Sequence, residues 1–390
     1  MKFMILGVNQ KNKGNAALVK TTIEIIKKVI RDPEFYLMGP NEDFLDKHRI
    51  IENPTYGMSL RSPQSIIKSF LTLLKIIIWK GFKMKFRKDD FLWYMQESDI
   101  VINSGGDHLS GEYGRASIIT LTNLLYALLL DKPIVLFSES LGYHKSLIVK
   151  RLLDYVLERS DLILLRESES YQYVQEHIRT KNYYLTADPA FILDSSKTNI
   201  EKFDRPIIGF NISPLLSQFA DKIDILRIST KAIEKISKML GGTLLLIPHV
   251  YGKDSDLKIL SQIYNHLSLD NIFLIEDEYE PEELKFIIGN CDLFIGARMH
   301  ATIASTSMFV PTVGIAYSHK MHGIIGEMLS LEDYIIDLED LNHEILIEKV
   351  MKAWENKERI VEHLKKTIPR VKERALKNGE LLKRLCDSLS

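Results

Sequence analysis

The chain has 390 residues, of which 45% are hydrophobic and 26% charged, and its formal net charge is -1. These values exclude a disordered chain and are ordinary for a soluble globular protein. The near-neutral charge gives no overall electrostatic reason to bind nucleic acid. The two cysteines, Cys291 and Cys386, form no CxxC pair, so we expect neither a zinc knuckle nor a disulfide scaffold, but a reducing, cytoplasmic location.

Short apolar runs alternate with helical stretches through the first half of the chain. Residues 1–8 are predicted to form a strand, and a helix is expected at 15–30 after a Gly/Asn loop. The same alternation predicts strands at 99–103, 133–138 and 162–165 and helices at 115–130 and 146–158. Buried strands that alternate with helices are typical of parallel sheets covered on both faces.

The pattern restarts after a polar segment at 195–205, which we interpret as a linker. The fold class is therefore expected to be α/β, with two Rossmann-like domains facing a cleft, at 1–200 and 201–343. C-terminal helices should follow at 344–390, where Pro369 interrupts or kinks the last one. The second domain is predicted to contain strands at 206–212, 243–247, 271–275, 292–295 and 312–316 and helices at 222–239, 254–267, 280–288 and 301–308.

Polar residues directly after the strands are the candidates for a site, because parallel α/β sheets bind ligands beyond the carboxyl ends of their strands. The clearest case is Arg298-Met299-His300, between a predicted strand and a predicted helix. Arginine offers a fork of donors for a carboxylate or phosphate, the helix start favours the same anion, and histidine can move a proton near neutral pH. The alternative is a surface arginine and a capping histidine.

Weaker candidates follow other predicted strands. Tyr317 and Lys320 would supply a donor and a second cation, or form a solvated cluster. Asp188 could orient a catalytic base, hold a sugar hydroxyl or belong to an Asx-Pro turn. The remaining candidates could bind substrate or serve as turn and capping residues, and they are Gly14, Asn15, Gly106, Asp107, Glu139 and Arg166. We see no acidic cluster with metal-ligand spacing and expect no essential metal.

Residues 61–88 carry eight cations and no acidic residue, interleaved with large apolar residues that include Trp79. This composition favours a basic amphipathic helix, inserted in the first domain, that lies on an anionic membrane surface. The alternative is an ordinary helix with its lysines in water. The segment is too interrupted to span a bilayer.

Taken together, these motifs resemble the polysaccharide pyruvyl transferase family, from residue 1 to about residue 334. The resemblance depends on their order and spacing. The motifs are Asn12-x-Gly14-Asn15, Gly105-Gly106, Arg166-Glu167-x-x-Ser170, Asp188-Pro189-Ala190-Phe191, Arg298-x-His300, Val310-Pro311 and Tyr317-x-x-Lys320. Departures from the family pattern fall in the first domain, at Ala16-Ala17, at Leu141-Gly142-Tyr143 and at Asp107.

The resemblance implies a GT-B-like architecture and an enzyme that moves the enolpyruvyl group of phosphoenolpyruvate onto two hydroxyls of a sugar. The donor is a substrate, and no cofactor is expected. Acceptors of the family are sugars of capsule, cell wall or exopolysaccharide, often on a lipid carrier, which suits a cytoplasmic protein at the inner face of the membrane. His300 would transfer protons, Arg298 would clamp the anion, and Asp188 or Glu139 would hold the sugar.

Two other functions fit part of the sequence. A GT-B glycosyltransferase with a nucleotide-sugar donor would need a slot for the base and a partner for the ribose. A membrane-associated assembly protein without catalysis would keep the segment 61–88 and tolerate loss of His300.

Overall fold

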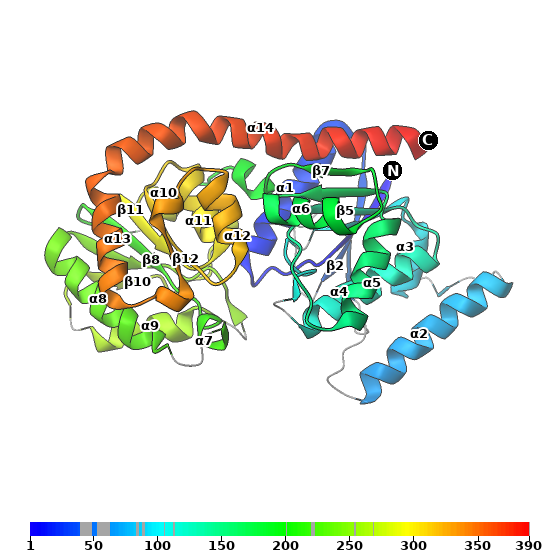
Figure 1. The fold of residues 1–390 in the computed structure, drawn as a ribbon, viewed down its shortest axis with the longest axis horizontal. Helices are drawn as coiled ribbons and strands as arrows, with labels where there is room; N and C mark the ends of the chain where they lie inside the picture. Colours follow the sequence, from blue (N-terminus) through cyan, green and yellow to red (C-terminus); the bar gives the residue numbers. More distant parts are fainter. Residues whose placement is uncertain are drawn as a thin grey trace. The chain divides into compact units, whose positions relative to one another are not determined.

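The computed structural model describes residues 1–39, 49–52, 63–82, 86–87, 90–104, 106–111, 114–199, 201–219, 223–252, 255–267 and 269–389. The chain forms two compact units (Figure 1). The N-terminal unit comprises Met1–Gln10, Leu18–Pro189 and Arg374–Ser390, and the C-terminal unit comprises Lys11–Ala17 and Ala190–Glu373. The predicted boundary at residue 200 therefore does not separate the units completely. Arg374–Ser390 belongs to the N-terminal unit, and Lys11–Ala17 belongs to the C-terminal unit.

The N-terminal unit is built on a parallel sheet that has seven strands within the described residues, in the order β3-β2-β1-β4-β5-β6-β7. Its strands are β1 (Lys2–Leu6), β2 (Glu34–Gly39), β3 (Arg49–Glu52), β4 (Ile100–Asn103), β5 (Ile134–Glu139), β6 (Leu162–Leu165) and β7 (Tyr183–Leu185). The helices are α1 (Lys13–Val29), α2 (Pro63–Phe82), α3 (Phe91–Glu97), α4 (Arg115–Leu129), α5 (Leu147–Arg159) and α6 (Ser168–His177).

The C-terminal unit repeats this plan with six described strands, in the order β10-β9-β8-β11-β12-β13. Its strands are β8 (Ile207–Asn211), β9 (Thr243–Leu246), β10 (Ile272–Leu274), β11 (Leu293–Gly296), β12 (Thr312–Ala316) and β13 (Ile335–Asp337). The helices are α7 (Leu216–Phe219), α8 (Ile225–Leu240), α9 (Leu257–His266), α10 (Pro281–Gly289), α11 (Met299–Ser307), α12 (His319–Met321), α13 (His343–Glu355) and α14 (Lys357–Leu389).

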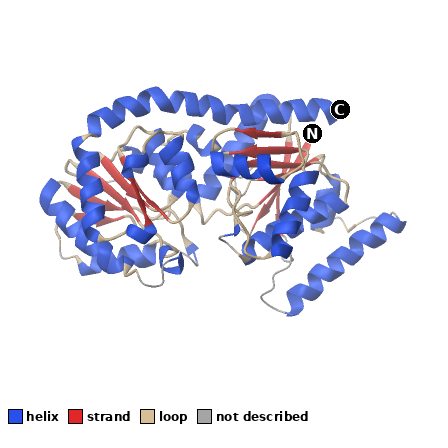
Figure 2. Cartoon of the chain, viewed as in Figure 1, coloured by secondary structure: helices blue, strands red, loops and turns tan. Residues whose placement is uncertain are grey.

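Both sheets have the Rossmann strand order, and helices cover both faces of each sheet (Figure 2). All residues of the central strands β4, β5, β8, β11 and β12 are buried, which is why they read as continuous apolar runs in the sequence. In each sheet the order reverses beside the first strand, between β1 and β4 and between β8 and β11. The predicted α/β class with two Rossmann-like domains is confirmed.

The structure differs from the sequence-based expectation mainly at the sheet edges and at the C-terminus. Strands β2, β3, β7 and β13 were not predicted. Strand β7 is three residues long, and Tyr184 and Leu185 on it are more than a third exposed, so it lacks the buried apolar pattern. Pro369 does not interrupt the last helix, since α14 continues through it from Lys357 to Leu389.

Helix α2 packs against the N-terminal unit along one side only. Ile76 is 1% exposed in the core, and the hydroxyl of Tyr126 on α4 donates to the carbonyl of Ser69 at 3.3 Å. Of the basic residues in the segment 61–88, Arg61, Lys83, Lys85 and Lys88 lie outside the described residues, as does the side chain of Lys68. In the described part of the chain, no helix is both long and apolar enough to cross a bilayer.

Candidate functional site

Arg298 lies where the C-terminal sheet reverses its strand order, directly after β11. Its N–H donates to the side-chain oxygen of Asn211, the last residue of the neighbouring strand β8, at 3.1 Å. Its Nε and Nη2 donate to Oδ1 of Asp256 at 3.1 and 2.7 Å. Arg298 as a whole residue is 8% exposed, so most of the guanidinium faces this internal partner.

Asp256 is a fully buried carboxylate that organises the loop after β9, and it was not among the sequence candidates. Its Oδ2 accepts the N–H groups of His249 and Val250, both at 3.0 Å, and the amide of Asn211 at 3.3 Å. One carboxylate thus ties the end of β8, the loop after β9 and the arginine after β11. The only sequence signal was an aspartate in the first turn of the helix predicted at 254–267, which equally indicates a residue that favours the helix N-terminus.

The segment Lys11–Ala17, which follows β1, belongs to the C-terminal unit and lies against His300. The N–H of Lys13 donates to the carbonyl of His249 at 3.1 Å. A Cβ atom at Gly14 would lie 2.4 Å from Nδ1 of His300, closer than any real contact, so the imidazole is seated directly on this glycine. Gly14 and Asn15 were predicted as part of the first domain. The structure places them beside the histidine of the second.

Replacing Gly14 by Ala should therefore displace the imidazole of His300. The free energy of unfolding should fall by about 1–3 kcal/mol, the usual cost of overpacking, because the new methyl group would also lie 2.7 Å from Cβ of His300, which cannot swing away. If His300 transfers protons, the turnover of the folded variant should fall by roughly 10- to 100-fold, because misplacing a reacting group by about 1 Å costs that much. Gly81→Ala is the matched control, since it also lies in a helix and a Cβ there would meet nothing within 4 Å. Unchanged turnover in Gly14→Ala would contradict this arrangement.

A small cavity of about 10 Å³, room for one water at most, adjoins His300 in the same unit. Lys13, His249 and Lys285 also line it, so four basic side chains surround one space. Lys13 pairs with Glu278 at 2.9 Å and Glu280 at 3.6 Å. The positive charge is therefore partly balanced on one side of the cavity.

Burial changes the protonation of two of these groups. Burial, together with the positive charges of His300, Arg298 and Lys13, lowers the pKa of His249 to about 3. Burial, with the charge of Lys372 acting in the same direction, lowers the pKa of Lys285 to about 7. Lys285 Nζ donates to the carbonyls of Leu193 at 2.6 Å and Phe191 at 3.4 Å, which fastens the start of the C-terminal unit to α10.

The lowered pKa of His249 predicts a loss of stability in acid. Below about pH 6.5 the unfolded chain binds a proton at this position, whereas the folded chain stays neutral down to about pH 3. As the pH is lowered through that window, the free energy of unfolding should therefore decrease, by at most about 1.4 kcal/mol per pH unit. Urea unfolding between pH 6.5 and 5 should show a shallower fall in His249→Gln than in the parent chain.

The pH dependence of the parent chain alone does not isolate His249, because Glu167 changes the free energy of unfolding with pH in the opposite direction. The slopes of the variant and the parent chain must therefore be compared. Burial raises the pKa of Glu167 to about 7, so its contribution to stability is lost as the pH rises from about 4.5 to about 7. His266→Gln, at an exposed histidine, is the matched control and should leave the slope unchanged. An identical slope in His249→Gln would contradict a neutral buried imidazole.

Tyr317 and Lys320 follow β12, the strand next to β11. Lys320 is 2% exposed, and its Nζ lies 5.6 Å from the centre of the Tyr317 ring. The same ring stacks on Phe219, with the ring centres 5.0 Å apart. Tyr317 and Lys320 line a small cavity with Ala297 and Met299, the two neighbours of Arg298. The structure thus brings the second predicted cation to the edge of the sheet that holds Arg298.

The candidates of the N-terminal unit form a separate buried cluster. Arg166 and Asp188 are 1% and 0% exposed and form a salt bridge of 2.7 Å, and Arg166 Nε donates to Ser140 at 2.8 Å. Burial opposes the charge of Arg166, but Asp188, Asp107 and Glu139 raise its pKa overall. Asp188 is thus enclosed with Arg166 and has no oxygen exposed to solvent, and its role toward a substrate stays a prediction.

The other candidates of this unit lie around that salt bridge. Gly106 adopts a left-handed backbone with φ 75°, and a Cβ there would come within 3.1 Å of Arg166 Nη1. Glu139 is fully buried and accepts the side-chain amide of Asn103 at 2.6 Å, while Asp107 is partly exposed. Gly105 lies outside the described residues. Glu167, the second residue of Arg-Glu-x-x-Ser, caps α6 by accepting the N–H of Ser170 at 3.0 Å.

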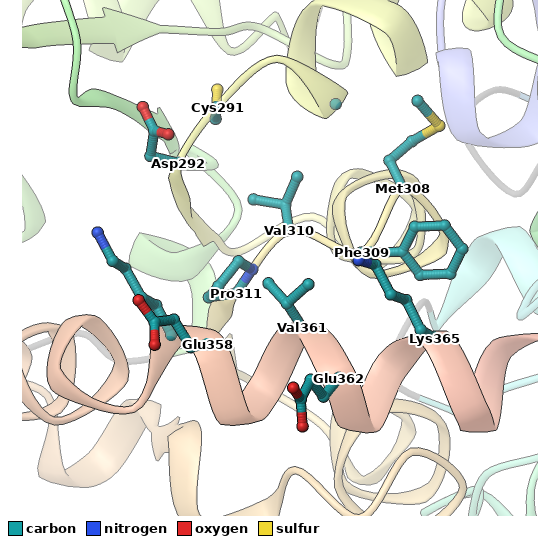
Figure 3. Close-up of a pocket in the computed structure, with 12 residues that line it drawn as sticks. Cys291, Asp292, Met308, Phe309, Val310, Pro311, Glu358, Val361, Glu362 and Lys365 are labelled. Atoms are coloured by element: carbon teal, nitrogen blue, oxygen red, sulfur yellow. The ribbon is translucent and has the colours of Figure 1, made fainter.

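A wider cavity of about 490 Å³ occurs at the opposite end of the C-terminal sheet (Figure 3). It is lined by residues that precede β11 and β12, such as Asp292 and Pro311, and by Val361 and Lys365 of α14. None of the predicted site residues lines it. Across the described residues, no three His, Cys, Asp or Glu side chains gather closely enough to hold a metal ion.

Comparisons with known proteins agree with the fold and with the motifs. The chain is 23% identical to the amylovoran biosynthesis protein AmsJ of Erwinia amylovora, and the match covers 97% of each chain. A Listeria monocytogenes structure described as a UDP-N-acetylglucosamine 2-epimerase matches with a TM-score of 0.62 and 14% identity, over 96% of this chain and 93% of that one. A glycosyltransferase from Rickettsia africae matches with a TM-score of 0.54 and 12% identity, over 100% and 96%.

The structural matches are too distant in sequence to show more than the fold, and they confirm the GT-B-like class. The family model for polysaccharide pyruvyl transferase matches residues 12–319, from Asn12 beside the Gly14 turn to His319 after β12. That range contains Gly14, Asp256, Arg298 and His300. The chain therefore belongs to the polysaccharide pyruvyl transferase family, as its motifs predicted.

Proposed function

We propose that this enzyme transfers the enolpyruvyl group of phosphoenolpyruvate onto two hydroxyls of a sugar, and so forms a cyclic pyruvate ketal during synthesis of capsule or exopolysaccharide. The observation that carries the proposal is a gathering of basic side chains where the C-terminal sheet reverses its order. Arg298, His300 and Lys13 lie around the buried, neutral imidazole of His249, and Lys320 follows the next strand. A donor with a carboxylate and a phosphate needs several such groups.

The donor would bind on the surface of this cluster, because the cavity beside His300 is too small to hold it. Met299 and Tyr317 are partly exposed and would contact the donor directly. Nε2 of His300 is buried, so this histidine would exchange protons with the donor through a water in the small cavity beside its ring. The Arg298 side chain keeps about 10% of its surface exposed, and Lys320 is buried beneath Tyr317. Lys320 would act as a fixed positive charge under the donor. The exposed part of the Arg298 guanidinium would donate to an anionic group of the donor, an interaction strengthened by the low-dielectric surroundings.

The chemistry has two stages. A proton added to the methylene carbon of phosphoenolpyruvate makes C2 electrophilic, and one sugar hydroxyl attacks C2 and loses its proton. Phosphate then leaves with the electrons of the C2–O bond, and the second hydroxyl closes the ring and releases its proton. We assign proton transfer to His300 and charge stabilisation to Arg298. No cofactor enters this sequence, because the donor is a substrate.

The N-terminal unit would supply the acidic groups that hold the acceptor sugar. Asp107 is the partly exposed acidic candidate of the N-terminal unit, and Glu139 would act through Asn103. We propose that the sugar is held on a lipid carrier, at the inner face of the cell membrane. The likeness to AmsJ, an amylovoran biosynthesis protein, supports a role of this chain in biosynthesis of a polysaccharide.

Mass spectrometry of candidate acceptors incubated with phosphoenolpyruvate tests the proposal. The expected product is heavier than the acceptor by one pyruvate less one water, and inorganic phosphate appears in equal amount. A nucleotide-sugar glycosyltransferase would instead bind nucleoside diphosphates in a ligand-shift assay and ignore phosphoenolpyruvate. Tight binding of a nucleoside diphosphate without any ketal product would overturn the proposal.

A further inference from the structure

Helix α2 has two apolar faces, and only one of them is used by the N-terminal unit. The inner face holds Ile76 in the core, and Leu73 and Trp79 pack against the same core. The outer face presents large apolar side chains to solvent. They are Phe70 (65% exposed), Leu71 (48%), Leu74 (41%), Ile77 (63%), Ile78 (37%) and Phe82 (79%).

These six residues form one continuous stripe. At 3.6 residues per turn their positions fall within roughly 140° of the helix circumference. Figure 1 shows α2, in light blue, at the periphery of the N-terminal unit. Single exposed apolar residues are normal on protein surfaces, but a contiguous stripe of this width indicates a binding surface.

The charged residues of α2 itself are all lysines. Between Phe70 and Phe82 the charged residues are Lys75 and Lys80, and the sequence has no acidic residue from 61 to 88. Helical spacing puts Lys75 and Lys80 on opposite borders of the stripe. They pair with Asp90 at 2.8 Å and Asp131 at 2.9 Å, but their side chains remain 57% and 50% exposed. Such exposed pairs contribute little and exchange readily for other anions.

We infer that the outer face of α2 docks on the surface of a bilayer that contains anionic lipids. The apolar stripe would enter the boundary between headgroups and acyl chains, and the bordering lysines would reach the phosphates. A protein partner fits less well, because lysine is depleted at protein interfaces. The inference rests on the proposed function in one respect, since the bilayer is where a lipid-linked acceptor would be presented.

Co-sedimentation of the full-length protein with vesicles tests this inference without any turnover. We compare phosphatidylcholine vesicles with and without phosphatidylglycerol, at low and high salt. The parent chain should bind the anionic vesicles, more weakly at high salt. The variant Leu74→Glu/Ile77→Glu/Phe82→Glu should bind them at least tenfold more weakly. Its circular dichroism and thermal unfolding should match those of the parent chain, because the three side chains face solvent.

The matched control carries the same three charges on other exposed apolar residues, as Met239→Glu/Tyr264→Glu/Leu376→Glu, and should bind vesicles like the parent chain. Equal vesicle binding by the α2 variant and the parent, or no binding by the parent, would overturn the inference. So would a parent chain that self-associates through α2 without binding vesicles, since the occupant would then be a second copy. Vesicle binding without any ketal product would leave this inference standing and reject the proposed function.

Discussion

Arg298→Lys should lower kcat by roughly 10²–10³-fold, the usual loss when one preorganised donor is removed from a charge-stabilising site. Lysine keeps the positive charge next to Asp256 but replaces a planar fork of donors by a single point. Nε and Nη2 of Arg298 already donate hydrogen bonds to Asp256. We therefore expect the lysine variant to be stable and almost inactive, as measured by phosphate release at saturating phosphoenolpyruvate and by urea unfolding.

Arg298→Ala is the less informative variant of this position. It would leave the fully buried Asp256 without its cation, and breaking such a pair costs about 3–5 kcal/mol. Its inactivity could then reflect unfolding. Lys357→Ala, a cation on α14 that lines the cavity at the other end of the sheet, serves as the control and should keep full turnover. Near-normal kcat in Arg298→Lys would remove the guanidinium from the mechanism.

Asp256→Asn should be the most destabilising conservative change in the C-terminal unit. Asp256 accepts hydrogen bonds on both oxygens, from Arg298 on one and from three N–H donors on the other. An asparagine would turn an NH₂ group toward one of these sets and leave Arg298 without its counter-charge. We expect the free energy of unfolding to fall by about 3–5 kcal/mol, measured by urea denaturation.

The effect on catalysis separates a positioning role from mere stability. If Asp256 acts by orienting Arg298, Asp256→Asn should lower kcat even at temperatures at which the variant is fully folded. The double variant with Arg298→Lys should then lose less transition-state stabilisation than the sum of the two single losses. Glu234→Gln breaks an exposed pair with Lys238 and should cost no more than ~0.5 kcal/mol. Additive losses in kcat would show that the two residues act independently.

Much of the secondary structure was readable from the sequence because the central strands are buried on both sides. Strand β6 lies at Leu162–Leu165 and β12 at Thr312–Ala316, as predicted. Their apolar runs need no partner to be recognised. Strands β7 and β13 are short edge strands without that signal, and α14 passes through Pro369 despite the local penalty of a missing hydrogen bond.

The sequence indicated some residues of the candidate site but not others. Arg298 and His300 were found because a strand, a turn and a helix frame them within a few residues. Asp256 was missed because its role depends on four donors from β8, from the loop after β9 and from Arg298, which are far apart in the sequence. For Asp188 the sequence left a substrate role and a turn both open, because no local pattern shows that Arg166 lies 2.7 Å away.

The amino-acid sequence by itself determined the alternation of strands and helices, the residues at the strand ends and the family, because burial on both faces and turn chemistry leave local patterns. Only the tertiary structure decided that Gly14 lies under His300 and that Asp256 holds Arg298. It also decided that Asp188 is enclosed with Arg166. These are contacts between segments distant along the chain, and their energies come from burial and charge pairing, which no short stretch of sequence records.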